Sequence, residues 1–252
     1  PYSLFPIPYS LFPIPYSPMM PYWLVPQGAE FQAVRQGLSL VARTLPAAEI
    51  PQRMPQLIPI PLGSRPLDRW LPQLQAPPGS IVLLLGVAGS LTDQYPVPAA
   101  IVCASIQTLD QRYACDAQVL ADLRLQLPQT PVGHAFCSDR IVTQVAEKRD
   151  LGSRYGCDLV EMEGAIVAQA LGEKGLRWGM VRVISDDLRR DIPDLSQALR
   201  PDGGINPLAL ATTFLQQPLG AAHFIQGSLQ ALSHLKTIAH QLGEAQANFE
   251  RV

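Results

Sequence analysis

The sequence predicts an α/β fold in which helices cover both faces of a largely parallel sheet. Two observations carry this prediction: short apolar runs of strand length recur along the chain, and segments with helical periodicity separate them. The run at residues 81–85, IVLLL, contains no polar residue, which is typical of a strand covered on both faces. With 252 residues, 47% of them hydrophobic, the chain can bury the core of a single domain, which we assign to residues 21–252.

The expected elements alternate from residue 22 onward. Residues 22–25 form a short strand, residues 26–28 a turn, and residues 30–42 a helix whose apolar face is Phe31, Val34, Leu38 and Val41. Residues 46–78 are rich in proline and are expected to be irregular, with an edge strand at 57–60. The later strands are expected at 81–85, 101–106, 133–137, 159–162 and 180–184, and the later helices at 117–127, 143–151, 163–171 and 228–242. The last helix places Leu229, Leu232, Leu235, Ile238 and Leu242 on one packed face.

The first 20 residues form a separate segment built from a heptapeptide repeat. PYSLFPI occupies residues 1–7, recurs at 8–14 and begins again at 15–17. Because proline recurs every few residues, we expect this segment to be extended or disordered. It is either a proline-rich ligand for another protein or a duplication in the coding DNA, and in the second case the native start is Met19 or Met20.

Charge and composition exclude several classes of function. The net charge is −2 without a basic block, which excludes a nucleic-acid binder. No apolar run reaches the roughly 18 residues of a membrane span, so we expect no stable membrane insertion and a cytoplasmic location. The cysteines and histidines have no metal-site spacing and no GxSxG motif is present, so we expect neither a metal centre nor a serine-hydrolase triad. The four thiols are expected to be small buried residues of a reducing compartment: Cys103, Cys115, Cys137 and Cys157.

Two expected strands end in carboxylates. Glu161 and Glu163 close the strand at 159–162, and Asp186 and Asp187 close the strand at 180–184. In open α/β sheets, ligands bind where strands end. A carboxylate in the first helical turn can also serve the helix dipole alone, but a second acidic pair on a neighbouring strand end favours a ligand site.

A glycine-containing segment, GVAGSL at residues 86–91, follows the buried strand at 81–85. Glycine lets a backbone approach a ligand closely, so we expect a ligand-binding loop here, with a plain tight turn as the alternative. The segment lacks the Lys-Ser/Thr pair of a phosphate-binding P-loop and the full GxGxxG of a dinucleotide site.

Together these motifs resemble the purine nucleoside phosphorylase and nucleosidase superfamily. The resemblance rests on VPQGAE at 25–30, GVAGSL at 86–91, VEMEG at 160–164 and VISDD at 183–187. Methylthioadenosine/S-adenosylhomocysteine nucleosidases are similar, and the segment from Ile192 to Leu210 is closer to the hopanoid-associated phosphorylases. The resemblance implies a single three-layer α/β/α domain around a mixed, partly barrel-like sheet, assembled as a homo-oligomer.

The resemblance also implies an activity on a small molecule, the cleavage of the N-glycosidic bond of an adenine-type purine nucleoside. Asp186 matches the acid that protonates N7 of the purine, which requires a raised pKa that burial beside other carboxylates would supply. Asp187 either assists that shift or faces solvent, and we expect it to face solvent. Glu30 matches the carboxylate that activates water, and Glu163 matches the one that holds the ribose hydroxyls. The other substrate-binding residues implied are Met162, Glu161, Gly86, Val87, Ala88, Gly89 and Ser185.

The nucleophile is the open choice. No cofactor is expected, and phosphate is a co-substrate only if the protein is a phosphorylase. The glycine-and-arginine phosphate motif of the phosphorylases is missing near residues 25–30, and Val87 stands where relatives place a hydroxyl, so water is favoured. Four residues keep phosphorolysis of a purine nucleoside or an adenosylated hopanoid precursor open: Ser90, Arg35, Arg112 and Arg182. A third alternative is a non-catalytic nucleoside-binding or storage protein of the same fold.

Overall fold

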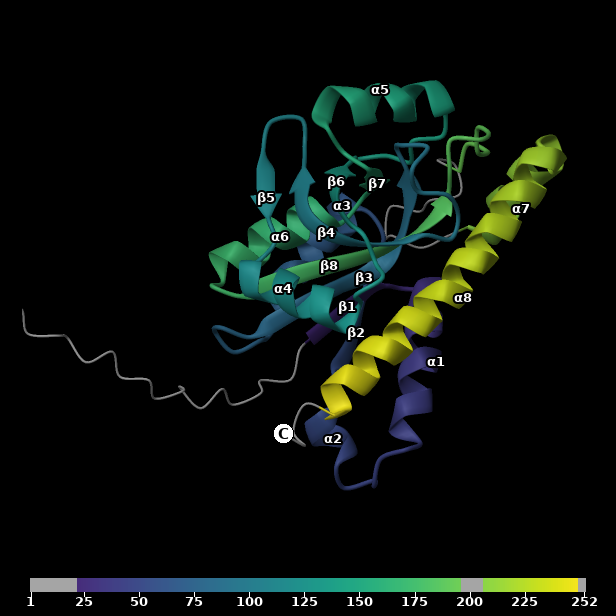
Figure 1. Cartoon of the computed structure of the whole chain (residues 1–252). Coiled ribbons are helices and arrows are strands. Elements are labelled where there is room, and N and C mark those ends of the chain that lie inside the picture. Colours follow the sequence, from purple (N-terminus) through teal and green to yellow (C-terminus); the bar gives the residue numbers. More distant parts are fainter. Residues whose placement is uncertain (1–21, 196–205, 249–252) are drawn as a thin grey trace, which may run out of the picture.

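A mixed eight-stranded sheet forms the centre of the computed structural model, which describes residues 22–195 and 206–248 (Figure 1). The heptapeptide repeat at residues 1–20 and residues 201–204 of the resemblance lie outside the described residues. The strands are β1 Tyr22–Pro26, β2 Gln56–Ile60, β3 Ile81–Ser90, β4 Ala100–Gln107, β5 Arg112–Ala114, β6 Val132–Cys137, β7 Leu159–Glu161 and β8 Arg177–Asp186.

Five of these strands close on themselves. The pairing runs from β3 to β7, β6, β4 and β8 and returns to β3, while β1 and β2 extend the sheet from β3 and β5 flanks β4. The pairs β3–β7, β4–β8 and β4–β5 are antiparallel and the other five are parallel. The mixed, partly barrel-like α/β domain implied by the resemblance is therefore confirmed.

Helices pack on two sides of the sheet and form two cores. They are α1 Ala29–Ala42, α2 Ile50–Arg53, α3 Ser64–Trp70, α4 Ala117–Gln126, α5 Val145–Tyr155, α6 Gly164–Glu173, α7 Pro207–Gln216 and α8 Pro218–Asn248, with a 3₁₀ turn at Leu71–Gln73. Along β3, Val82 and Leu84 join the core under α3 and α6, whereas Leu83 and Leu85 join the core under α1, α4 and α8. Burial on both faces explains why residues 81–85 contain no polar residue.

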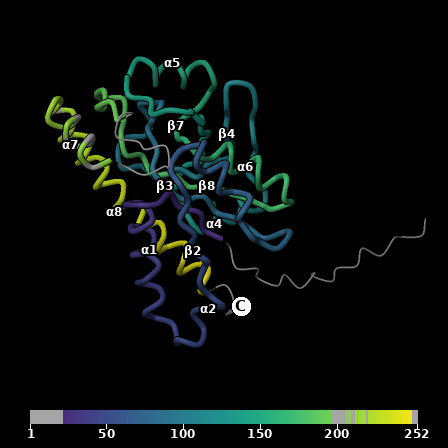
Figure 2. The backbone as a smooth tube through the Cα atoms, turned by 180° about the vertical axis from the view of Figure 1, so that it is seen from behind, coloured from purple at the N-terminus to yellow at the C-terminus, as the bar shows by residue number. Residues whose placement is uncertain are grey.

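The helices α1 and α8 lie side by side, as both views of the backbone show (Figures 1 and 2). They meet at Gly37, where a Cβ would overlap the backbone oxygen of Lys236. The expected face of α8 is wrong at Leu229, which is 62% exposed, whereas Gly227 and Ala231 are buried in its place. A Cβ at Gly227 would overlap the backbone oxygen of Ser185, so α8 approaches the end of β8 closely.

The expected loop after residue 85 is also wrong. Residues 86–90 continue β3: Gly86 pairs with Arg182 of β8, and Gly89 pairs with Val160 of β7. The strand passes from one neighbour to another, with a register shift between Ala88 and Gly89. Periodicity within one segment does not report such pairing, because the partners lie about 70 to 100 residues later in the chain.

Other boundaries differ for local reasons. The proline-rich segment at 46–78 contains α2, α3 and the 3₁₀ turn, because Pro51 and Pro72 stand in first turns where no hydrogen-bond donor is needed. The helix expected at 143–151 is α5, which ends at Gly156 with a left-handed φ of 62°. Both α7 and β5 were not expected, and α8 begins at Pro218 rather than at residue 228.

None of the helices in the described part of the chain combines the length and apolarity that a bilayer crossing requires. All four cysteines are free thiols. Cys103, Cys115 and Cys157 are buried and Cys137 is half-buried, and burial raises the pKa of Cys115 to about 12.

Candidate functional site

A cavity of about 260 Å³ lies where β3, β7 and β8 end. Its apolar wall comes from several elements and includes Leu62, Ile141, Val142, Ile192, Leu195 and Phe224. Its polar wall is formed mainly by carboxylates. Of the ten site residues predicted from the sequence, all but Gly86 line it: Glu30, Val87, Ala88, Gly89, Glu161, Met162, Glu163, Ser185 and Asp186.

Glu30 reaches the cavity from the first turn of α1. The turn at Gly28, with φ of 98°, ends β1 and starts this helix beside β3. The backbone N–H of Val87 donates to Glu30 Oε2 over 2.9 Å. Burial, reinforced by the charges of Glu163 and Glu161, raises the pKa of Glu30 to about 8, although Arg182 and the Val87 N–H act in the opposite direction. Glu30 can therefore exchange a proton near neutral pH.

Glu161 holds the start of α6. Its Oε2 accepts hydrogen bonds from the backbone N–H groups of Glu163 and Gly164, over 3.1 and 2.7 Å, and from Arg182 Nη2 over 2.6 Å. The carboxylate that serves the helix N-terminus is thus Glu161 rather than Glu163.

Glu163 is consequently left to face the cavity. Its Oε1 accepts from the Gly63 N–H over 2.9 Å, which fixes the loop after β2 against the site. Burial, together with the charge of Glu161, raises the pKa of Glu163.

Arg182 lies behind the cavity, at the centre of these carboxylates. Its side chain is fully buried, and Nη2 lies 2.6 Å from Glu161 Oε2 and 3.7 Å from Glu163 Oε2. Nε and Nη1 have no hydrogen-bond partner among the described residues. The sequence placed Arg182 only among the phosphate candidates. Its signal was a charged residue inside an apolar strand, which requires a buried counter-charge.

Gly86 is the residue of β3 that packs against this cluster of charged side chains. A Cβ at this residue would overlap both Arg182 Nη1 and Glu30 Oε2. We expect Gly86→Ala to lower the free energy of unfolding by about 1–3 kcal/mol, because the added Cβ would displace the two charged groups from their present bonds to Val87 and Glu161. Gly172→Ala in α6 is the matched control: its Cβ meets nothing within 4 Å, so stability should stay the same or rise. Chemical denaturation of both variants tests this, and equal effects would contradict it.

Asp186 ends β8 and lines the same cavity as Glu30. We expected other carboxylates beside it, but its neighbours are the ammonium of Lys148, which is ion-paired with Oδ2, and the hydroxyl of Ser185, 3.0 Å from Oδ1. Asp187 was expected to face solvent. Its side chain is only 12% exposed and pairs with Arg189.

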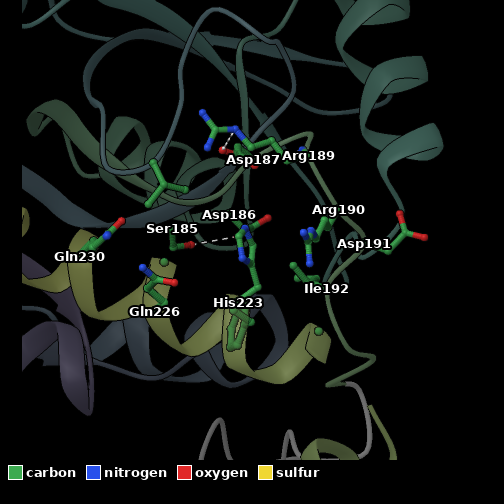
Figure 3. Close-up of a pocket in the computed structure, with 14 residues that line it drawn as sticks. Ser185, Asp186, Asp187, Arg189, Arg190, Asp191, Ile192, His223, Gln226 and Gln230 are labelled. Carbon is green, nitrogen blue, oxygen red and sulfur yellow. Dashed lines mark hydrogen bonds and ion pairs between the residues drawn. The ribbon is translucent and has the colours of Figure 1, made fainter. Parts of the chain in front are cut away.

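A second, smaller cavity of about 160 Å³ is also lined by Asp186 (Figure 3). It is bounded by the segment after β8 and by the first turns of α8, and its polar lining includes Arg190, His223 and Gln226. Ser185, Asp186, Ile192 and Phe224 line both cavities. Asp186 therefore contributes to the lining of both cavities.

The remaining phosphate candidates lie elsewhere. The Ser90 hydroxyl donates to the backbone oxygen of Thr92, Arg112 bonds Gln107 and the backbone of Tyr155, and Arg35 is exposed on α1. Within the described ranges, the cation that lines the larger cavity is Arg140, and it is ion-paired with Glu147. The same ranges hold no group of three or more potential metal ligands.

Comparison with known proteins yields one family and many structural relatives. A family model described as "Phosphorylase superfamily" matches residues 80–215. The structure is similar to that of 5′-methylthioadenosine/S-adenosylhomocysteine nucleosidase from Campylobacter jejuni, with a TM-score of 0.61 and 13% identity over 92% of this chain and 100% of that one.

The corresponding enzyme from Helicobacter pylori gives a TM-score of 0.59 and 14% identity over 91% of this chain and 98% of that one. The structure of a futalosine hydrolase mutant from Helicobacter pylori gives a TM-score of 0.53 and 17% identity over 66% of this chain and 90% of that one. Identities this low establish similarity of fold. Among curated proteins, no sequence matches the chain significantly.

Proposed function

Because the chain belongs to the phosphorylase superfamily, we propose that it cleaves the N-glycosidic bond of an adenine-type purine nucleoside with water as the nucleophile. The observation that carries this proposal is the excess of carboxylates over cations around the cavity. Four acidic side chains lie around the cavity, Glu30, Glu161, Glu163 and Asp186, beside two buried cations, Arg182 and Lys148. Arg140, which lines the cavity, is itself ion-paired with Glu147.

This charge distribution suits the sugar in the transition state. As the bond to the purine breaks, positive charge develops on the ribose ring, and fixed carboxylates in a water-poor cavity stabilise it. Glu163 is assigned to the ribose hydroxyls, because the Gly63 N–H and Arg182 hold its two oxygens at the cavity wall. Met162, beside Gly63, packs against the sugar.

Water is assigned to the space beside Glu30. The Val87 N–H orients the Glu30 carboxylate, which lines the cavity and can accept a hydrogen bond from one water molecule there. Glu30, with a pKa of about 8, takes the proton of the attacking water. The Val87 backbone supplies this contact, so a hydroxyl side chain at that position is not required.

The purine is assigned to the apolar part of the cavity, with Asp186 at its N7. Ile141, Val142 and Phe224 offer flat apolar contacts for the base. Asp186 and Glu30 line the same cavity, so Glu30 takes a proton from water while Asp186 passes one to the leaving purine.

Phosphate fits this cavity poorly. A phosphate dianion at the position of the water would meet Glu30 and Glu163, and the two arginines at the cavity are already paired, Arg182 with Glu161 and Arg140 with Glu147. Once Glu30 is ionised, like charges at such short range cost several kcal/mol, so at the pH at which Glu30 acts as a base the cluster disfavours the anion that phosphorolysis needs.

The test is base release by the full chain with adenosine, 5′-methylthioadenosine and inosine, in phosphate-free buffer and in buffer with phosphate. We expect free adenine and a free pentose without phosphate, and no acceleration when phosphate is added. Separating the products by chromatography distinguishes the free sugar from the sugar 1-phosphate.

Base release that requires phosphate would replace the proposal with phosphorolysis. Binding of a nucleoside, measured by calorimetry, without any base release would indicate a non-catalytic binding protein. Release from inosine but not from either adenine nucleoside would contradict the assigned base.

A further inference from the structure

Lys148 is the feature that the proposed mechanism leaves unexplained. Among the residues that the structure describes, Lys148 and Arg182 are the buried cationic side chains, and Lys148 is 0% exposed. Its ammonium is ion-paired with Asp186 Oδ2, and Asp186 is only 11% exposed. A buried ammonium must therefore be accounted for directly beside the proposed acid.

Packing alone does not explain a lysine at position 148, because burying its ammonium costs hydration free energy. It is the one buried residue of α5, a helix whose other residues are exposed or half-buried. A buried ion pair contributes little net stability compared with apolar residues of similar volume, because both charges lose their hydration. A methionine or leucine would fill the same space without that loss, which favours a chemical role for the ammonium.

The surrounding structure holds α5 in register with the end of β8. Asp191 Oδ1 accepts from the backbone N–H of Val145, over 2.7 Å, at the start of α5. The backbone N–H of Ile192 donates to the backbone oxygen of Thr143 over 3.0 Å. These two bonds join the segment after β8 to the start of α5. They therefore hold together the two elements that carry Asp186 and Lys148.

The carboxylate of Asp186 is thereby fixed at both oxygens. Lys148 binds Oδ2, and the Ser185 hydroxyl lies 3.0 Å from Oδ1, as the dashed line in Figure 3 marks. Each carboxylate oxygen has a further lone pair for a substrate. The ammonium of Lys148 is a proton donor in direct contact with this carboxylate, so a proton can pass from Lys148 through Asp186 to the leaving purine.

We infer that Lys148 is a positioning residue that fixes Asp186 and supplies the proton that Asp186 passes to the purine. The inference rests on the proposed function. The C–N bond breaks with both electrons going to the purine, N7 takes a proton through the Asp186 carboxylate, and the Lys148 ammonium becomes a neutral amine. Attack by water transfers one proton to Glu30. Afterwards Glu30 releases this proton to solvent and the Lys148 amine takes up one proton from solvent, so both groups return to their starting states.

The experiment compares two leaving groups, adenine from adenosine and 7-methyladenine from 7-methyladenosine. In the second substrate N7 carries a methyl group and a positive charge, so the base leaves neutral and needs no proton. We expect Lys148→Met to lower kcat on adenosine by about 100-fold or more, the range of general acid catalysis, and to change kcat on 7-methyladenosine by no more than about 3-fold.

Lys148→Arg separates charge from proton supply, because a guanidinium keeps its proton. It should lower kcat on adenosine almost as much as Lys148→Met does, and it serves alone if the Met variant does not fold. Lys174→Met, at an exposed lysine that bonds the backbone of Leu74, is the matched control and should leave both rates unchanged.

Equal losses on both substrates would overturn the inference and leave Lys148 a purely structural residue, as would full activity of Lys148→Arg on adenosine. Failure of the proposed function is distinguishable, because the wild-type chain would then release no base from either substrate.

Discussion

A Glu30→Gln variant is expected to lose about 1,000-fold in kcat and to be more stable than the wild type at pH 8. The loss follows because glutamine cannot take a proton from water, and general base catalysis is worth about 10²–10⁴-fold. The amide oxygen of glutamine can still accept the Val87 N–H, so the local structure should persist. Activity and stability should therefore change in opposite directions.

The stability effect depends on pH in a defined direction. The unfolded chain releases the Glu30 proton near pH 4.5, whereas the folded protein keeps it to about pH 8. Between these values the folded state binds more protons, so the wild type loses stability as pH rises. Glutamine has no proton to lose. Its advantage should be absent below about pH 4.5 and reach about 4 kcal/mol at pH 8, on a scale of roughly 1.4 kcal/mol per pKa unit.

Denaturant unfolding between pH 4.5 and pH 8.5, with kcat measured on the same samples, checks both parts. Glu173→Gln, on the outer face of α6, is the control and should change neither quantity. An advantage of Glu30→Gln that does not grow with pH would contradict the buried, proton-binding state of Glu30. Full activity of the variant would remove Glu30 from its assigned role.

Local sequence patterns carried much of the fold and most of the site. Continuous apolar residues at 81–85 predicted a strand buried on both faces because the two cores take alternate side chains. Carboxylates at the ends of β7 and β8 predicted a site because these strands end at one cavity. Both the apolar run and the acidic strand ends extend over only a few residues. Sequence patterns of that length predict local structure.

Features that depend on distant pairing were not accessible in this way. Closure of the barrel requires β3 to leave β8 and join β7, and nothing between Gly86 and Ser90 encodes which strands lie alongside. Lys148 stands in a helix of polar residues, where a lysine is ordinarily solvated. Its burial follows from the end of β8, almost 40 residues later in the chain.

An Arg182→Met variant is expected to lose about 3–5 kcal/mol of stability, the usual cost of removing one partner from a buried ion pair. Glu161 would keep its two backbone donors from α6 but would lose its counter-charge. Arg177→Met is the matched control on the same strand. Arg177 pairs with Asp116 at a half-exposed position, so its loss should cost about 1 kcal/mol or less.

The same substitution should also move the pH dependence of activity. Arg182 lowers the pKa values of Glu30 and Glu163, so its removal raises both and shifts the rise of kcat with pH to higher pH. Adding Glu161→Gln to Arg182→Met removes the unpaired buried charge and should recover part of the stability, because the amide oxygen can still accept the α6 N–H groups. If the double variant is no more stable than the single one, the charge of Glu161 is not what Arg182 balances, and the loss reflects packing alone.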